Sequence, residues 1–275
     1  MNYSFKGSYL TYIGIYLTSF STLLFEISLT RVFSIAQWYH FAFMVVSMAL
    51  LGYGASGSFI MLFPSILKRD TYSVLSKGSL LFAITSLLSY MIANRIAFDP
   101  VKIAWDPSQL FYIFVYYALL SIPFFFSGMT ISIAISSFSK DVNSIYFSDL
   151  LGAGSGCLSA LLIFFIFGAS HAIAVASITG ICASTIFTLR SRASGNYGFL
   201  FRLFIIAIPL SSIIFSPSCM NINISPYKGL PIALHYPDAE VLKTKWDSFS
   251  RIDVIMSGSV RFAPGLSLQF QDELP

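Results

Sequence analysis

The sequence predicts an all-α polytopic membrane bundle of about seven transmembrane helices, followed by a short β-rich C-terminal segment. Hydrophobic residues make up 56% of the 275 residues and charged residues only 10%, and the mean hydropathy is +0.77. A soluble globular domain carries about 25% charged residues because its surface must face water. Phe and Tyr occur 28 and 15 times, as expected for lipid-facing rings and interfacial belts. We therefore expect the lipid bilayer to surround much of this chain.

Seven stretches are long enough to cross a bilayer, which takes about 20 mostly apolar residues. The first is expected to be retained, because Glu26 and the segment FEISLTRVFS stand where a cleaved signal peptide needs small residues. The fourth contains Pro123, which predicts a kink or tilt rather than two spans. The predicted spans are Tyr9–Leu29, Tyr39–Phe63, Gly78–Ala97, Leu110–Phe138, Leu150–Phe167, Ala172–Leu189 and Phe199–Phe215.

The basic residues between these spans predict the orientation of the chain in a cell membrane. With a cytoplasmic N-terminus, the outer loops hold three basic residues, Arg31, Arg95 and Lys102. The inner segments then hold eight, which are Lys6, Lys68, Arg69, Lys77, Lys140, Arg190, Arg192 and Arg202. Because cytoplasmic loops are enriched in Lys and Arg, this orientation is favoured. It places the segment after the seventh span outside the cytoplasm.

The composition changes after Ser216, and we divide the chain into a helical membrane domain, 1–216, and a β-rich segment, 217–275. Six prolines interrupt the second segment, which excludes another span. The stretches EVLKTKW and SRIDVIMSG alternate partly between polar and apolar positions, which is typical of short, half-exposed strands. A segment this small makes a poor independent core. We therefore expect it to be the start of a larger domain.

Two glycine-containing motifs are interpreted as helix-packing sites. DLLGAGSGC has a G-x-G-x-G spacing, but nucleotide binding requires a buried strand before it, and an apolar span follows it here. Gly152 and Gly156 are four residues apart and therefore share one helix face, as do Gly52 and Ser56 in LGYGASG. Small residues at this spacing allow two membrane helices to approach closely.

Four ionisable residues near membrane depth form a candidate intramembrane polar site: Glu26, Arg31, His40 and Asp149. Burying a charge in lipid costs at least about 2.5 kcal/mol, so charged residues at this depth usually have a structural or functional role. A Glu26–Arg31 pair facing the bundle interior would line a polar cavity or a proton path. Alternatively, the pair lies at the interface and fixes helix ends. Asp149, or Ser148 beside it, is also expected to cap the N-terminus of the fifth span.

No residues are predicted to be catalytic, to bind a cofactor or to ligate a metal. The chain has no HExxH, paired-carboxylate or Ser-His-Asp arrangement, and Cys157, Cys182 and Cys219 match no metal spacing. The net charge of +4 comes from short clusters between apolar runs rather than from a basic stripe. We therefore expect no nucleic-acid partner.

Several segments in the same order resemble the membrane region of spermidine-synthase-like proteins: FEISLTRVFS, WYHFAFMVVSMALLGYGASG and YFSDLLGAGSGC. In that family the membrane region is fused to a polyamine aminopropyltransferase-like domain. The segment SPYKGLPIALHYPDAEVLKTKWDSFSRIDVIMSGSVRFAPGLSL resembles the join to that domain and its opening strands. The chain ends at Pro275, before the family's cofactor site, so the resemblance implies a truncated or split gene product.

The resemblance implies a membrane domain that is non-catalytic by itself and that anchors or partners a soluble aminopropyltransferase-like domain. An enzyme of that family would face the cytoplasm, whereas the charge bias places the tail outside. Either one span is miscounted, for example because Arg31–Trp38 is re-entrant, or the tail is no cytoplasmic enzyme. A different hypothesis is a small transporter for polyamines or a related cation, which would use Glu26 and Asp149.

Overall fold

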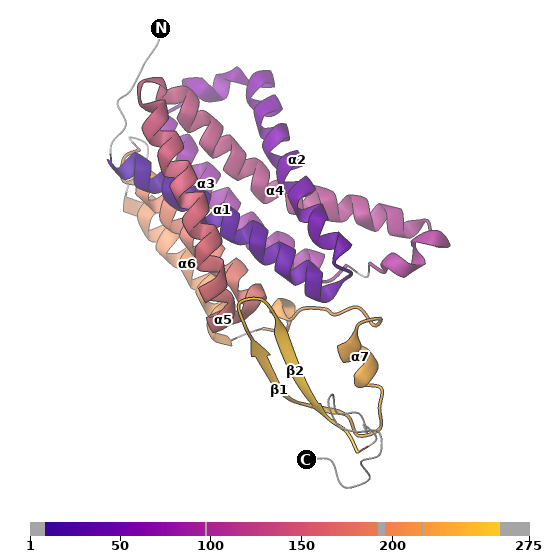
Figure 1. Ribbon diagram of the computed structural model, residues 1–275. Coiled ribbons are helices and arrows are strands. Elements are labelled where there is room, and N and C mark those ends of the chain that lie inside the picture. Colours follow the sequence, from indigo (N-terminus) through magenta and orange to yellow (C-terminus); the bar gives the residue numbers. More distant parts are fainter. Residues whose placement is uncertain (1–8, 97, 192–195, 216, 259–275) are drawn as a thin grey trace.

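The computed structural model describes residues 9–96, 98–191, 196–215 and 217–258. Within them, long α-helices form a bundle, and one antiparallel pair of strands lies beyond one end of it (Figure 1). The helices are α1 (Tyr9–Ala36), α2 (His40–Leu62), α3 (Thr71–Ala93), α4 (Ser108–Ser137), α5 (Val142–Thr188), α6 (Asn196–Phe215) and the short α7 (Gly229–Ala233). Four 3-10 helices connect them, at Pro64–Lys68, Pro100–Ala104, Ser139–Asp141 and Ser218–Met220.

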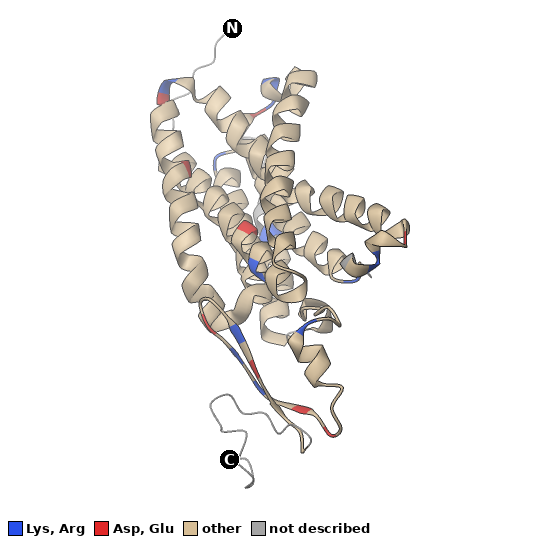
Figure 2. Ribbon diagram, turned by 45° about the vertical axis from the view of Figure 1, so that its right-hand side comes forward, with Lys and Arg blue, Asp and Glu red and all other residues tan. Residues whose placement is uncertain are grey.

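In the part of the chain that the structure describes, five helical segments are long and apolar enough to cross a membrane. They are α1, α2, α3, α4 and the segment Ser139–Thr188, which contains α5; the apolar stretch of α6, Phe204–Phe215, is shorter. Charged residues gather mainly where the chain turns, and long stretches of helix carry none (Figure 2). The prediction of a helical membrane bundle with a small sheet is therefore confirmed at this level.

The long helix α5 is two helices joined at Gly168. Its 47 residues would extend about 70 Å, more than twice the roughly 30 Å core of a bilayer. Gly168 has φ +78° and ψ 166°, outside the helical region. Before it, Gly152 and Gly156 pack on Tyr16 and Phe20 of α1; after it, Phe187 lies back beside Gly14 of α1. The two parts of α5, 142–167 and 169–188, therefore run in opposite directions.

Aromatic side chains fill the centre of the bundle, where α1 lies against α2, α4 and α5. Phe25 of α1 is fully buried, and its ring centroid lies 5.3 Å from that of Phe124 in α4 and 6.1 Å from that of Phe82 in α3. The outer faces of the same helices expose large apolar residues such as Leu50 and Leu158. Large apolar side chains thus occupy both the centre and the outer faces of the helices, as expected for a bundle surrounded by hydrocarbon.

Hydrogen bonds join three helix ends and connections at one end of the bundle. The Asp70 side chain caps α3 by accepting from Ser73 N at 3.1 Å and also accepts from Ser191 Oγ at 2.8 Å. Tyr72 OH lies 3.1 Å from Thr11 Oγ1, and Arg190 Nε donates to it at 3.2 Å. The start of α1, the α2–α3 connection and the end of α5 therefore share one end.

The two strands predicted in the tail are confirmed. Strands β1 (Glu240–Trp246) and β2 (Arg251–Met256) pair antiparallel, with Trp246 opposite Arg251 next to the turn and an irregularity between Val241 and Lys243. Most β1 side chains are exposed, and Trp246, at its end, is half-buried. The hairpin therefore has no hydrophobic core of its own among the described residues.

Two expectations about local structure are wrong. The segment Arg31–Trp38 is not re-entrant, because α1 continues as a regular helix to Ala36. Neither Asp149 nor Ser148 caps a helix: α5 already begins at Val142, because apolar residues in this stretch, such as the fully buried Ile145, pack in the bundle. Arg202, which was counted with the cytoplasmic basic residues although the predicted span Phe199–Phe215 contains it, lies in α6, where it is buried against α3 and α5.

Candidate functional site

The four residues predicted to form an intramembrane polar site lie in three different environments. Glu26 and Asp149 are half-buried in α1 and α5, Arg31 contacts the tail, and His40 is exposed at the start of α2. The His40 ring lies against that of Tyr39, with ring centroids 3.7 Å apart and the ring planes tilted by 45°. Neither of the two ion pairs among the described residues involves Glu26 or Arg31. The structure therefore does not bring the four residues together.

Asp149 of α5 contacts the same face of α1 from which Glu26 projects, at a different position along the helix axis. Ser19 Oγ, which is almost fully buried, donates a hydrogen bond to Asp149 Oδ1. Glu26 follows Ser19 by seven residues, so it projects from the same face of α1 about 10 Å further along the axis. The two carboxylates are therefore separate polar positions within the bundle.

Hydroxyl groups extend this polar region towards α2 and α4. A 2.6 Å hydrogen bond joins the hydroxyls of Thr22 and Ser127, and Tyr53 OH lies 3.5 Å from Ser127 Oγ. Thr22 is one helical turn before Glu26 on α1, so its hydroxyl and the Glu26 carboxylate share a face of that helix. A carboxylate with nearby hydroxyls can hold a proton or a small cation, because both groups offer oxygen ligands.

Arg31 binds the turn of the β-hairpin. Its Nη1 donates to Phe249 O at 2.6 Å and its Nη2 to Ser248 O at 3.2 Å, while its guanidinium lies 6.0 Å from the ring centroid of Phe164 in α5. Ser248 Oγ donates to Leu161 O at 3.1 Å. The end of α1 and the first part of α5 thus hold the turn between β1 and β2.

Trp246, the last residue of β1, packs on the reversal of α5. A Cβ added at Gly168 would lie 2.9 Å from ring atoms Cε2 and Nε1 of Trp246. Arg251, opposite it in the hairpin, places its guanidinium 5.8 Å from the Trp246 ring centroid and pairs with Asp253 at 3.0 Å. The hairpin is therefore docked on the bundle through an aromatic contact as well as through Arg31.

Residues 217–228, the first part of the tail, which we call the strap, lead from α6 to α7 across the same end of the bundle. Ser225 N donates to Ala36 O at 2.8 Å, and Lys228 Nζ donates to Ser34 O at 3.0 Å. From α3, Tyr90 OH donates to Met220 O at 3.0 Å, and the Asn94 amide donates to Cys219 O and Asn221 O. The strap is thus bound to the ends of α1 and α3.

The residues predicted to serve helix packing lie at two helix interfaces. A Cβ added at Gly156 would come 2.5 Å from Phe20 O, and one at Gly152 would overlap Tyr16 O, so α5 approaches the α1 backbone there. In α2, a Cβ at Gly52 would lie 2.5 Å from Ser121 O of α4. Ser56, one turn on, is fully buried beside Gly128 of α4.

A buried polar cluster that was not predicted from the sequence surrounds Arg202. Its Nε donates to Ser184 Oγ at 2.9 Å, and its Nη2 donates to Ser76 Oγ at 2.8 Å. Ser76 Oγ also lies 2.6 Å from Thr188 Oγ1. The four-residue spacing of Ser184 and Thr188 on one helix face was the available signal, but spacing cannot show which helix that face meets.

Outside the helices of membrane length, the turn before α4 holds a carboxylate in a defined geometry. Asp106 Oδ1 accepts from Ser108 Oγ at 2.6 Å and from Ser108 N at 3.1 Å, and Oδ2 accepts from Gln109 Nε2 at 2.7 Å. The Ser108 hydroxyl, followed by the Gln109 amide, lowers the pKa of Asp106 below its usual value. The carboxylate fixes the first turn of α4.

Within the described residues, no group of three or more His, Cys, Asp or Glu residues is placed to hold a metal ion. What the structure does present is a polar region in the bundle and a docking surface for the tail at one end. No family model, curated protein or solved structure matches the chain.

Proposed function

We propose that the chain is a membrane domain with seven crossings, made by α1 to α4, the two parts of α5, and α6. The reversal at Gly168 supports counting α5 twice, because each of its parts has about 20 residues or more. The 20-residue α6 has the length of a span, although its apolar stretch is shorter. An odd number of crossings agrees with the strap and hairpin lying at the end of the bundle opposite the start of α1.

The N-terminal end of α1 faces the cytoplasm in this proposal. The connections at that end hold Lys68, Arg69, Lys140 and Arg190, whereas the α3–α4 connection at the other end holds Arg95 and Lys102. Since short cytoplasmic loops are enriched in Lys and Arg, this bias supports an external tail.

The function best supported is that of an anchor, non-catalytic by itself, for a soluble aminopropyltransferase-like domain. The observation that carries it is the docking of the tail: the segment that resembles the start of such a domain is held by Arg31, by the Trp246 contact at Gly168 and by the strap. A bundle that only crossed the membrane would not need a specific docking surface for this segment. The resemblance of the sequence supplies the identity of the soluble partner.

Vesicle flotation tests the anchoring function. We expect vesicles containing the full chain to carry a purified soluble aminopropyltransferase domain upward in a density gradient. The double variant Arg31→Ala/Trp246→Ala should release most of it, because both docking contacts of the hairpin are removed. Arg95→Ala, which removes an exposed charge at the same end of the bundle, is the matched control.

Two results would contradict the anchoring function. One is that the soluble domain stays at the bottom of the gradient with the unaltered chain. The other is that the purified chain alone transfers aminopropyl groups from decarboxylated S-adenosylmethionine to putrescine.

A second candidate, transport of polyamines or a related cation, is favoured by the two carboxylates within the bundle. Ionisable residues in membrane helices commonly mark ion pathways, and Thr22, one turn before Glu26 on α1, is hydrogen-bonded to the Ser127 hydroxyl, which Tyr53 OH approaches to 3.5 Å. Uptake of labelled putrescine into vesicles should then fall more than tenfold in Glu26→Gln and Asp149→Asn. Uptake equal to that of the unaltered chain in both variants excludes this function.

A further inference from the structure

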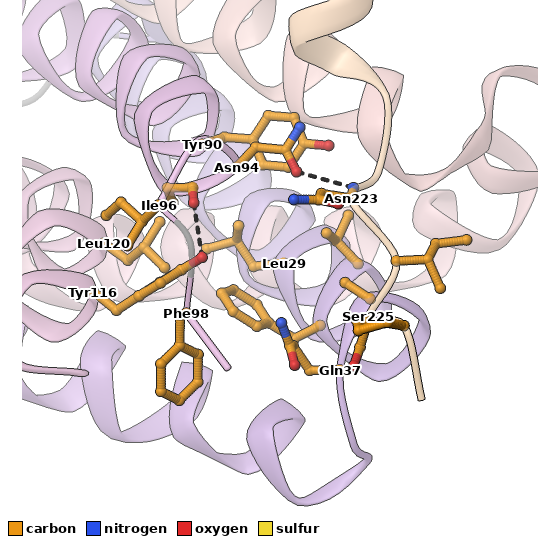
Figure 3. Close-up of a pocket in the computed structure, with 16 residues that line it drawn as sticks. Leu29, Gln37, Tyr90, Asn94, Ile96, Phe98, Tyr116, Leu120, Asn223 and Ser225 are labelled. Carbon is orange, nitrogen blue, oxygen red and sulfur yellow. Dashed lines mark hydrogen bonds between the residues drawn. The ribbon is translucent and has the colours of Figure 1, made fainter. Parts of the chain in front are cut away.

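A cavity of about 90 Å³ lies between the bundle and the strap. Its walls come from the ends of α1 and α3, from α4 and from the strap (Figure 3). On one side are the side chains of Ile96, Phe98, Tyr116 and Leu120; on the other are Asn223 and Ser225, with Gln37 between the two sides (Figure 3). None of the described lining residues is charged.

Most polar groups in this cavity already have partners. Tyr116 OH donates to Ala93 O at 2.7 Å, and Tyr90 OH donates to Met220 O at 3.0 Å. Asn94 Oδ1 accepts from Asn223 N at 3.1 Å, and its amide nitrogen donates to two strap carbonyls. These bonds fix the walls, so the cavity is built into the fold.

Gln37 is the exception. Its Oε1 atom is buried and, among the described residues, has no hydrogen-bond partner. A buried acceptor without a donor is destabilising, and native structures rarely leave one unexplained. The Gln37 side chain also carries an amide NH₂ group, so it offers an acceptor and a donor next to each other.

We propose that this cavity binds a small neutral molecule of the primary-amide class. A primary amide presents an N–H donor beside a carbonyl acceptor, which complements the Gln37 amide, while its alkyl part contacts Phe98 and Leu120. A charged ligand is disfavoured because the described walls offer no opposite charge. This assignment is independent of the anchoring function.

The cavity volume sets the size of the ligand. An apolar protein cavity of about 150 Å³ accepts benzene, with six carbon atoms, so about 90 Å³ accepts roughly four non-hydrogen atoms. Acetamide has this size. Acetone has nearly the same shape and the same acceptor but no N–H donor, so the two compounds form a matched pair of probes.

Saturation-transfer NMR on the full chain in deuterated detergent tests the assignment. We expect acetamide to bind with a millimolar dissociation constant, and acetone to bind roughly five- to tenfold more weakly, because it leaves Gln37 Oε1 unpaired. Gln37→Leu should abolish the preference for acetamide. Asn143→Leu, at an exposed position near the start of α5, should leave it unchanged.

A second variant keeps the test independent of any effect of Gln37→Leu on folding. Ala93→Leu adds bulk from the α3 wall while Gln37 is retained, so binding of both probes should fall at least fivefold. Equal affinity for acetamide and acetone, or no detectable binding of acetamide at tens of millimolar, would overturn the assignment and leave a cavity that holds water alone.

Discussion

Replacing Gly168 by Ala tests the reversal within α5. The conformation at φ +78° and ψ 166° is one that essentially only Gly adopts, and forcing another residue into it costs about 1–3 kcal/mol. The added Cβ would also lie 2.9 Å from two ring atoms of Trp246, and overpacking of this kind costs about 1–3 kcal/mol. Because Trp246 is only half-buried, its ring can shift with the hairpin, which places the packing cost at the low end. The expected total loss is about 2–4 kcal/mol.

Thermal unfolding of the purified chain in detergent measures this loss. A change of 1 kcal/mol shifts Tm by about 2–4 °C in a chain of about this size, so Gly168→Ala should unfold roughly 4–16 °C lower. In a Trp246→Ala background the ring overlap is absent. The effect of Gly168→Ala should then shrink to the backbone cost of about 1–3 kcal/mol.

Gly154→Ala is the control for Gly168→Ala. Gly154 also lies within α5, but no heavy atom outside its own helix would come within 4 Å of an added Cβ, so this change should leave Tm the same or slightly higher. If Gly168→Ala and Gly154→Ala unfold at the same temperature, the reversal is not held by a conformation restricted to Gly.

Three further predictions concern other parts of the chain. Gly152→Leu should destabilise the chain by about 3 kcal/mol, because the added Cβ overlaps the α1 backbone. Gly54→Leu, whose Cβ meets open space, should change stability by less than about 0.5 kcal/mol. Unfolding in detergent compares the two variants, and equal losses of stability would refute the packing role of Gly152. The lowered pKa of Asp106 means that its carboxylate stabilises the fold above the unfolded pKa of about 3.9, and that this stabilisation is lost as the pH falls through the lower folded pKa. The stability difference between the unaltered chain and Asp106→Asn should therefore vanish in strong acid, and a difference independent of pH would refute this account. Finally, alkaline phosphatase fused after Pro275 should be active, and green fluorescent protein inserted in the α2–α3 connection, next to Lys68 and Arg69, should fluoresce; the reverse pattern would refute the proposed orientation.

Most of the fold could be predicted because it depends on local hydropathy. Each predicted span overlaps a helix, since about 20 apolar residues identify a membrane helix without knowledge of its neighbours, although Gly78–Ala97 extends past the end of α3 at Ala93 and its last residue lies outside the described residues. The strands β1 and β2 were likewise predictable from alternation within EVLKTKW and SRIDVIMSG. The reversal within α5 was predicted only as a short loop, because the sequence does not specify the φ of Gly168.

The candidate site was less predictable because its contacts join distant parts of the chain. Arg31 was expected to pair with the nearby Glu26, but its donors reach carbonyls more than 200 residues away, which no spacing rule indicates. Arg202 was counted with the cytoplasmic basic residues, whereas three hydroxyl-bearing side chains on α3 and α5 form a buried polar site around it. The unpaired oxygen of Gln37 is buried in a cavity that the strap helps to enclose, and no pattern in the sequence indicates that the strap lies there.

The docking of Trp246 on Gly168 sets the direction in which the sheet leaves the helical bundle. A two-stranded hairpin is only marginally stable in water, so the bundle supplies the order that β1 and β2 lack by themselves. Among the described residues the sheet contains only these two strands, and a strand edge is a template for further pairing. Any strand that paired with either edge would take the orientation that the contacts of Trp246 and Arg31 give to β1 and β2. The bundle would therefore set the orientation of the whole sheet.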